Sequence, residues 1–109
     1  MPNATRDIVM ATEVLQRNQL LSTLRQLKPI LMERYGITRL GIFGSVARDE
    51  AAESSDIDIV VEMPPDLFTM VHLKEYLQET LQVSVDIVRY RSGMNAFLKQ
   101  RIDQEAIYV

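Results

Sequence analysis

The sequence predicts a small α+β domain, α/β-like in its element order, with a mixed sheet of three or four strands covered by helices. Three observations predict it. In two long segments apolar residues recur at steps of three and four, which is typical of amphipathic helices. Shorter segments alternate between apolar and other residues, which is typical of strands. The chain has 109 residues, which is enough for one hydrophobic core and no more.

Residues 1–17 are expected to form an N-terminal extension with a weak helical pattern. The domain itself is expected over residues 18–109. From Gln19 the helical pattern is stronger, because leucines at steps of four, three and four line one face of a helix. These are Leu20, Leu24, Leu27 and Leu31. Gly36 is expected to end this helix as its C-cap, since glycine adopts a left-handed conformation at low cost.

Pro29 lies inside this helical pattern. A proline inside a helix removes one backbone donor and clashes with the preceding turn. We therefore expect a kink or a break near Lys28, so that the helix would consist of two pieces.

Two strands follow, with a short helical segment between them. Residues 40–43 form an apolar run that ends in a tight turn at Gly44-Ser45, and residues 46–50 have room for about one helical turn. The second strand is expected from Ile57 to about residue 63. Two prolines then stop it, because proline cannot donate to a sheet ladder.

The remaining elements are a helix, a strand and a final helix. Asp66 is a candidate N-cap for a helix whose apolar residues are Leu67, Met70, Leu73, Leu77 and Leu81. The third strand is expected over residues 83–90, a helix over 94–104, and a short edge strand at the C-terminus. A helical crossover makes the second and third strands parallel, with helices covering one side of the sheet.

Composition excludes several classes of function. With 12 Lys and Arg against 15 Asp and Glu, the net charge is −3, so direct nucleic-acid binding is not expected. There is no cysteine, which excludes disulfides and thiolate zinc sites. No stretch is long and apolar enough to cross a membrane, and a cytoplasmic location is expected.

Carboxylates interrupt one face of the second strand. Side chains alternate along a strand, so Asp56 and Asp58 lie opposite the apolar residues between and after them. The same alternation in the third strand gives Asp86 the equivalent face, beside the Asp pair. A half-exposed strand would account for such charges, and taken alone that is the commoner explanation.

Two features favour a binding site instead. Aspartate is disfavoured in strands, and three carboxylates this close repel one another unless a cation neutralises them. An oxygen-only cluster suits Mg²⁺ or Mn²⁺. The Gly44-Ser45 turn offers backbone amides and a hydroxyl to a phosphate. Together they predict a nucleotide site.

Gly44-Ser45, ten intervening residues and Asp56-Ile57-Asp58 resemble the signature of the DNA polymerase beta-like nucleotidyltransferase superfamily. The longer string, from Gly44 through the strand after Asp56, is similar to the minimal nucleotidyltransferase (MNT) branch. The resemblance covers about residue 20 to the C-terminus, and it implies a palm-like fold.

The resemblance also implies roles for these residues. Three acids would hold two Mg²⁺ ions, with Asp56 and Asp58 ligating both and Asp86 ligating the one that activates the attacking oxygen. Gly44 and Ser45 would hold the triphosphate of ATP. The metals would brace the attacking and leaving oxygens of phosphoryl transfer.

Two charged residues follow the Gly44 turn. Asp49 stands where the MNT branch usually has glycine. Arg48 is expected either to contact phosphate or to form an ion pair that fixes the helical turn.

His72 is expected at the surface. The basic residues of the C-terminal part are expected on a solvated face, with contact to a triphosphate as the alternative: Arg89, Arg91, Lys99 and Arg101. Met94 and Phe97 are expected in the core.

The resemblance implies a partner as well as a reaction. MNT proteins are typically encoded with a HEPN-domain ribonuclease toxin, and the implied function is an antitoxin that attaches AMP from ATP to a tyrosine of that toxin. The alternative is a non-catalytic antitoxin that neutralises the toxin by direct binding, which the net negative charge favours. A transferase for small molecules or RNA ends is a third possibility, for which no acceptor pocket can be identified.

Overall fold

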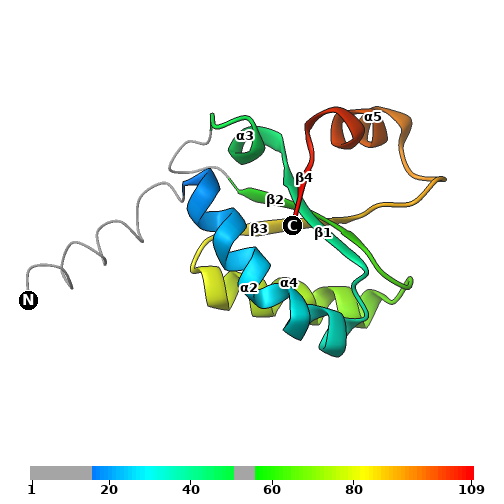
Figure 1. Ribbon diagram of the computed structural model, residues 1–109. Helices are drawn as coiled ribbons and strands as arrows, with labels where there is room; N and C mark the ends of the chain where they lie inside the picture. The colour runs from blue at the N-terminus through cyan, green and yellow to red at the C-terminus, as the bar shows by residue number, and fades with distance from the viewer. Residues whose placement is uncertain (1–15, 51–55) are drawn as a thin grey trace, which may run out of the picture.

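The computed structural model describes residues 16–50 and 56–109 (Figure 1). Every element expected from Gln19 onward is present. The predicted extension, residues 1–17, lies outside the described residues except for its last two. In chain order the elements are α2 (Arg17–Tyr35), β1 (Arg39–Phe43), α3 (Gly44–Ala47), β2 (Ile57–Glu62), α4 (Leu67–Leu81), β3 (Val85–Arg89), α5 (Ala96–Glu105) and β4 (Ile107–Tyr108).

The four strands form one mixed sheet in the order β3-β2-β1-β4. β1 is antiparallel to both β2 and β4, whereas β2 and β3 are parallel. The parallel pair confirms the predicted crossover through α4, and β4 confirms the predicted edge strand. The mixed α+β architecture is therefore the one expected from the sequence.

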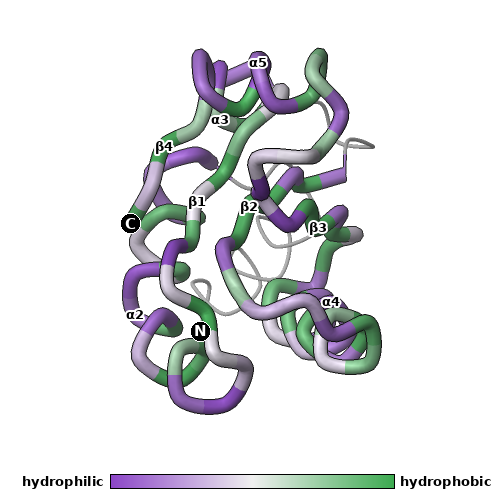
Figure 2. Tube along the Cα trace, turned by 90° about the vertical axis from the view of Figure 1, so that its right-hand side faces the viewer, coloured by the Kyte–Doolittle hydropathy of each residue, from purple (hydrophilic) through white to green (hydrophobic). Residues whose placement is uncertain are grey.

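Helices cover both faces of the sheet, so the prediction that they cover one side is wrong. Figures 1 and 2 show the sheet between α5 on one side and α2 and α4 on the other. On the α2 and α4 side the fully buried side chains include Leu20, Leu24, Leu31, Leu40, Ile42, Ile59, Val61, Leu73 and Leu77. On the α5 side Phe43, Val60 and Ile102 form a second, smaller core.

The α2 helix runs unbroken through Pro29, so the expected break near Lys28 is wrong. Pro29 and the residue one turn before it, Arg25, are exposed, and water can hydrate the carbonyl that the proline leaves without a partner. Leu24 and Leu31 lie on either side of the proline and are fully buried, which holds both halves of α2 against the sheet.

Helix ends follow the predicted capping chemistry. Gly36 adopts the left-handed conformation (φ 70°) and its N–H donates to the carbonyl of Met32. The Asp66 carboxylate accepts a hydrogen bond from the Thr69 N–H at 3.2 Å, which confirms it as the N-cap of α4. α5 begins two residues later than expected because the side chain of Asn95 caps it.

α5 contacts the sheet through one row of residues at steps of four. Met94, Leu98 and Ala106 pack around Ile102, which is fully buried. Phe97 lies off this row and is 81% exposed, so its predicted place in the core is wrong. Phe97 precedes Leu98 and points to the adjacent, solvent-facing side of the helix, so Ile102 takes the central position in this core.

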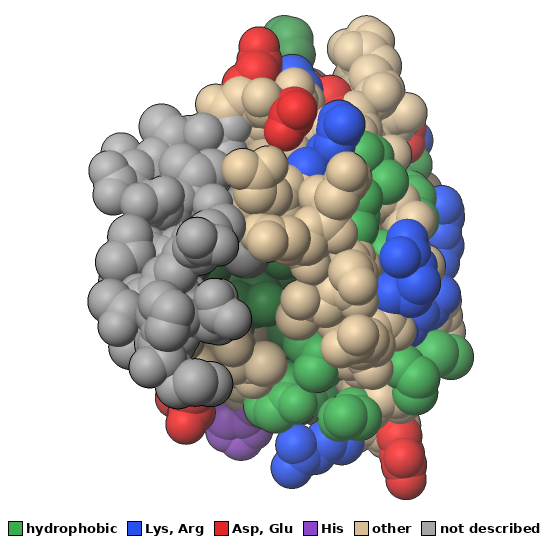
Figure 3. Space-filling model, turned by 60° about the vertical axis from the view of Figure 1, so that its left-hand side comes forward, with side chains coloured by type: hydrophobic (Ala, Val, Ile, Leu, Met, Phe, Trp, Pro, Cys, Tyr) green, Lys and Arg blue, Asp and Glu red, His purple; other side chains and the backbone are tan. Residues whose placement is uncertain are grey.

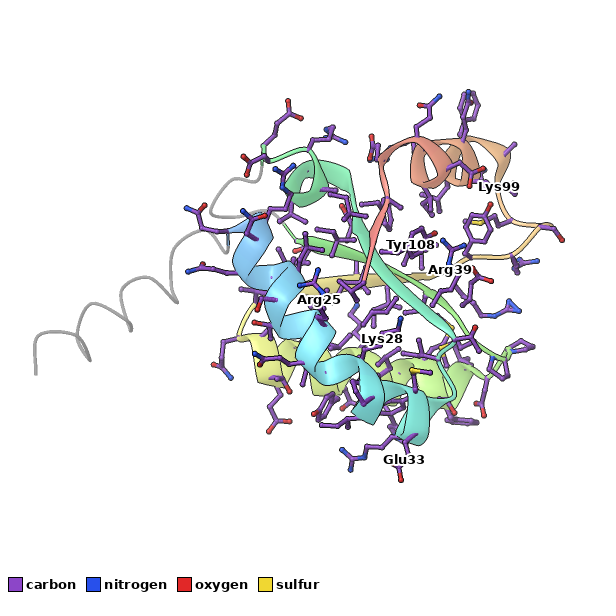
Figure 4. The ribbon with its side chains drawn as sticks, viewed as in Figure 1. Arg25, Lys28, Glu33, Arg39, Lys99 and Tyr108 are labelled. Atoms are coloured by element: carbon purple, nitrogen blue, oxygen red, sulfur yellow. The ribbon has the colours of Figure 1, made fainter. Side chains whose placement is uncertain are left out.

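β4 approaches β1 closely because β1 has a glycine at the contact. A Cβ on Gly41 would lie 2.7 Å from the carbonyl oxygen of Ile107 and 2.8 Å from Cδ1 of Tyr108. The Tyr108 ring in turn lies under the Arg39 guanidinium, 3.7 Å from it (Figure 4). This contact joins the start of β1 to the edge strand β4. Within the described ranges, no helix is long and apolar enough to span a bilayer.

Candidate active site

The site begins at the turn where β1 ends. Gly44 has φ 74°, in the left-handed region that favours glycine, and its Cα lies against the Asp58 side chain. A Cβ at this position would collide with Oδ2 of Asp58 and lie 3.0 Å from its Cγ. The positive φ and the close approach of Asp58 therefore both favour glycine at this turn.

Asp58 is at the centre of the predicted carboxylate cluster. Across the sheet its Cα is paired with that of Phe43, the last residue of β1, and with that of Asp86 in β3. Asp58 is half-buried, Asp86 is exposed, and Asp56 is exposed directly before β2. The register thus places Asp58 of β2 beside Asp86 of β3, as the alternation predicted.

The charges around Asp58 oppose one another. Burial raises the pKa of the Asp58 carboxyl, and the carboxylates of Asp86 and Asp56 raise it further. The guanidinium groups of Arg101 and Arg48 lower it, but the pKa remains above its usual value. The site therefore carries an excess of negative charge at Asp58, which a bound cation would neutralise.

The carboxylates are suited to a divalent cation by chemistry rather than by closed geometry. Within residues 16–50 and 56–109, no three His, Asp or Glu side chains converge as a set of metal ligands. The donors are oxygen-only, as Mg²⁺ prefers, and a cation would stabilise the Asp58 carboxylate, whose pKa burial and then the neighbouring carboxylates raise. The donor chemistry fits the metal that the resemblance implies, while the described side chains do not form a converged set of three ligands.

Arg48 forms the ion pairs that were one of its two predicted roles. Its Nε donates to Glu50 Oε1 at 2.7 Å, and its Nη1 donates to Glu105 Oε1 at 2.8 Å. Hydrogen bonds to Glu50 and then Glu105 raise the pKa of Arg48. The other predicted role, contact with phosphate, remains a prediction, and nothing in these pairs assigns Arg48 to catalysis.

Asp49 follows with φ 61°, which gives a physical reason for the glycine usual at this position. The turn requires a left-handed residue, and aspartate is one of the few others that adopt this conformation. The Asp49 side chain is exposed. The departure from the family pattern is therefore compatible with the turn.

Two residues of α5 lie at the turn; Glu105 was not identified from the sequence, and Arg101 was named only in the alternative that the basic residues contact a triphosphate. Glu105 Oε2 accepts a hydrogen bond from the Gly44 N–H at 3.0 Å, and the same oxygen lies 3.9 Å from Arg101 Nη2. Arg101 also acts electrostatically on Asp58. Its i,i+4 spacing to Glu105 is visible in the sequence, but only the packing of α5 on the sheet brings the pair to the turn.

The other basic residues lie elsewhere. Lys99 pairs with Asp103 at 3.4 Å, Asp103 also accepts a hydrogen bond from the Tyr90 hydroxyl at 2.7 Å, and Arg91 is exposed. His72, the predicted surface histidine, is exposed on α4, and Figure 3 shows the histidine side chain at the molecular surface. The solvated-face prediction therefore holds for Arg91, whereas Lys99 is half-buried beside the Tyr90 ring and Arg101 acts on Asp58. It is wrong for Arg89, whose Nε is buried and has no hydrogen-bond partner in the described part of the chain.

Comparison with known proteins identifies the family. Residues 24–109 match the nucleotidyltransferase domain family, and this range includes the turn, all three aspartates and α5. The chain belongs to this family. This nucleotidyltransferase is thus an enzyme of the type that its Gly-Ser turn and aspartates predicted, and its relatives place it in the MNT branch.

Relatives from archaea are similar over nearly their whole length. A candidate protein adenylyltransferase of Methanocaldococcus jannaschii, MJ0128, is 39% identical over 94 residues, which are 84% of this chain and 96% of the relative. Protein adenylyltransferase MntA of Thermococcus cleftensis is 36% identical over 98 residues, 88% of this chain and 98% of the relative.

Solved structures share the fold. A structure described as a candidate minimal nucleotidyltransferase has a TM-score of 0.71 and 37% identity, covering 85% of this chain and 95% of the other. A toxin-antitoxin complex with AMP-PNP gives 0.62 and 26%, covering 86% and 72%. A tri-AMPylated HEPN toxin of Shewanella oneidensis in complex with MNT antitoxin gives 0.62 and 21%, covering 85% and 71%, a likeness of fold alone.

Proposed function

We propose that this nucleotidyltransferase is an antitoxin that transfers AMP from ATP to a tyrosine of a HEPN ribonuclease toxin. The observation that carries the proposal is the contact between the Gly44 turn and Asp58, in register with Asp86. It joins a candidate triphosphate site to candidate metal ligands. The names of the relatives, protein adenylyltransferases among them, and the toxin-antitoxin complex with AMP-PNP support the choice of AMP as the transferred group and of a toxin as acceptor.

The residues divide the work of the transfer. Gly44 and Ser45 hold the triphosphate, because the turn has no side chain at Gly44 to keep phosphate oxygens from its backbone. Asp56 and Asp58 would hold two Mg²⁺ ions, and Asp86 would hold one of them. When bound, the ions would neutralise the phosphates and the carboxylates together.

The proposed reaction is an in-line displacement at the α-phosphorus. The acceptor tyrosine oxygen forms the new P–O bond, the bond to the bridging oxygen breaks, and pyrophosphate leaves with its electron pair. Asp86, which is exposed on β3, receives the tyrosine proton. Because ATP is the substrate, the proposal includes the cytoplasmic location expected from the sequence.

A labelling experiment tests the transfer. The chain is incubated with Mg²⁺, the HEPN protein encoded beside it, and ATP labelled at either the α- or the γ-phosphate. We expect the α label on the HEPN protein and no γ label. Asp58→Asn should reduce labelling to background, while Asp103→Asn should retain it, because Asp103 pairs with Tyr90 and Lys99 and not with the Gly44 turn. Transfer of the γ label would indicate a kinase instead.

The same variants distinguish the non-catalytic alternative. If Asp56→Ala and Asp58→Ala together abolish labelling but still rescue growth against the toxin, neutralisation acts by binding. If the double variant fails to rescue growth while it still binds the toxin, neutralisation requires the transfer.

A further inference from the structure

Glu105 occupies the turn that the proposed function assigns to the triphosphate. It is the last residue of α5, and its two carboxylate oxygens are engaged separately. Oε2 accepts from the Gly44 N–H at 3.0 Å, and Oε1 accepts from Arg48 Nη1 at 2.8 Å. Arg101, one turn earlier in α5, places Nη2 3.9 Å from Oε2.

Among the carboxylates that form ion pairs in the described part of the chain, that of Glu105 is the least exposed to solvent. The Glu105 side chain is 19% exposed, against 34% for Glu62, 49% for Asp103 and 63% for Glu50. Exposed ion pairs contribute little, whereas a covered, charge-assisted hydrogen bond contributes more. Glu105 therefore makes the most substantial acidic contact at the Gly44 turn.

The groups that Glu105 engages are groups that suit a phosphate. The Gly44 N–H has a single hydrogen, so a phosphate oxygen and a carboxylate oxygen compete for it. Both acceptors are anions, and Asp58 already lies against the same glycine. A triphosphate at this turn and the Glu105 carboxylate on the Gly44 amide therefore exclude each other.

We propose that Glu105 acts as an internal competitor of the nucleotide and sets its affinity. In the free enzyme it occupies the Gly44 amide, and binding of the triphosphate displaces it. Displacement releases Arg48 and Arg101 from Glu105 to the phosphates. This inference rests on the proposed function, since it requires a nucleotide at the Gly44 turn.

The displacement needs only a side-chain rotation. Glu105 ends α5 next to Ala106, which has an extended backbone, while buried Ile102 keeps the helix on the sheet. The two arginine side chains are 41% and 52% exposed for Arg48 and Arg101, so both can turn toward a ligand. Arg48 retains Glu50 as a partner in either state.

Titration calorimetry with Mg²⁺ and AMP-PNP tests the inference on the full chain. Glu105→Gln removes the charge but keeps the shape, and should bind AMP-PNP more tightly by up to about tenfold, because one charge-assisted contact no longer competes. Asp103→Asn on the same helix is the matched control and should bind as the wild type does. Unchanged or weaker binding by Glu105→Gln overturns the inference.

Carbon-13 NMR of the wild-type chain tests it without a variant. AMP-PNP should move the Glu105 side-chain carboxylate signal toward that of a solvated glutamate, and a signal that stays in place at saturation overturns the inference. The two proposals can fail separately. If the wild type binds no AMP-PNP, both are wrong; if it binds but Glu105 stays in place, only the present one is wrong.

Discussion

At the scale of single residues, the Gly44 and Asp58 pair is the feature from which the chemistry follows. Each residue alone has an ordinary explanation, a tight turn for the glycine and a half-solvated strand for the aspartate. A side chain at position 44 would displace the Asp58 carboxylate, and the turn brings a backbone amide close to the carboxylate cluster. Substitutions of Gly44 and Asp58 should therefore change stability and nucleotide binding differently from substitutions of glycine or aspartate elsewhere in the chain.

Gly44→Ala should remove nucleotide binding as well as stability. The left-handed φ of 74° costs about 1–2 kcal/mol for alanine, and the new Cβ would collide with Asp58. Gly36→Ala is the matched control, because its φ is 70° but its nearest neighbour, Pro64 Cδ, is 3.6 Å away. Urea denaturation should show that the left-handed backbone lowers the free energy of unfolding by a similar amount in both variants. AMP-PNP binding should be lost only in Gly44→Ala. Retained binding in Gly44→Ala would contradict the assigned contact.

Asp58→Asn should stabilise the metal-free protein at neutral pH. The folded-state pKa of Asp58 is raised, so its ionisation costs stability above that pKa, and the cost is absent below the usual carboxyl pKa of about 4. The difference between variant and wild type in thermal melting should therefore shrink as the pH falls through the carboxyl range.

Asp66→Asn is the control of opposite sign. The hydrogen bond from the Thr69 backbone lowers the pKa of Asp66, so its charge stabilises the fold above the usual carboxyl pKa and that stabilisation is lost in acid. This variant should melt slightly lower than the wild type at pH 7. A wild type that melts above Asp58→Asn at neutral pH without metal would contradict the electrostatic account.

At the scale of elements, local patterns predicted most of the structure. Alternation in β2 and β3 identified the apolar and acidic faces, and the crossover predicted their parallel pairing, so Asp58 and Asp86 could be placed side by side from the sequence. The row that α5 presents to the sheet was not predicted, because Phe97 has the stronger apolar signal but Ile102 has the central position. Glu105 was missed for the same reason.

Ile102→Ala should test how α5 is held. Ile102 is fully buried in the smaller core, so its truncation should lower the free energy of unfolding by about 2–4 kcal/mol. Phe97→Ala, on the exposed side of the same helix, should change it by less than about 0.5 kcal/mol. Urea denaturation measures both. Equal effects would contradict the observed rotation of α5.

At the scale of the whole molecule, the larger hydrophobic core and the candidate site lie on opposite faces of the sheet. Ile57, Ile59 and Val61 of β2 face the larger core, while Asp58 faces the opposite side, next to the Gly44 turn and α5. The second helical layer over that side could not be foreseen from the acidic face alone. Its presence is what makes Asp58 half-buried and so perturbs its pKa.

The central claim is that this fold transfers AMP to a tyrosine of a HEPN toxin. Intact-mass and peptide-mapping mass spectrometry of that partner, after incubation with the chain, ATP and Mg²⁺, tests it most directly. We predict one or more added AMP groups on tyrosine with the wild type and none with Asp58→Asn. An unmodified partner that is nevertheless neutralised by the wild-type chain would contradict the claim.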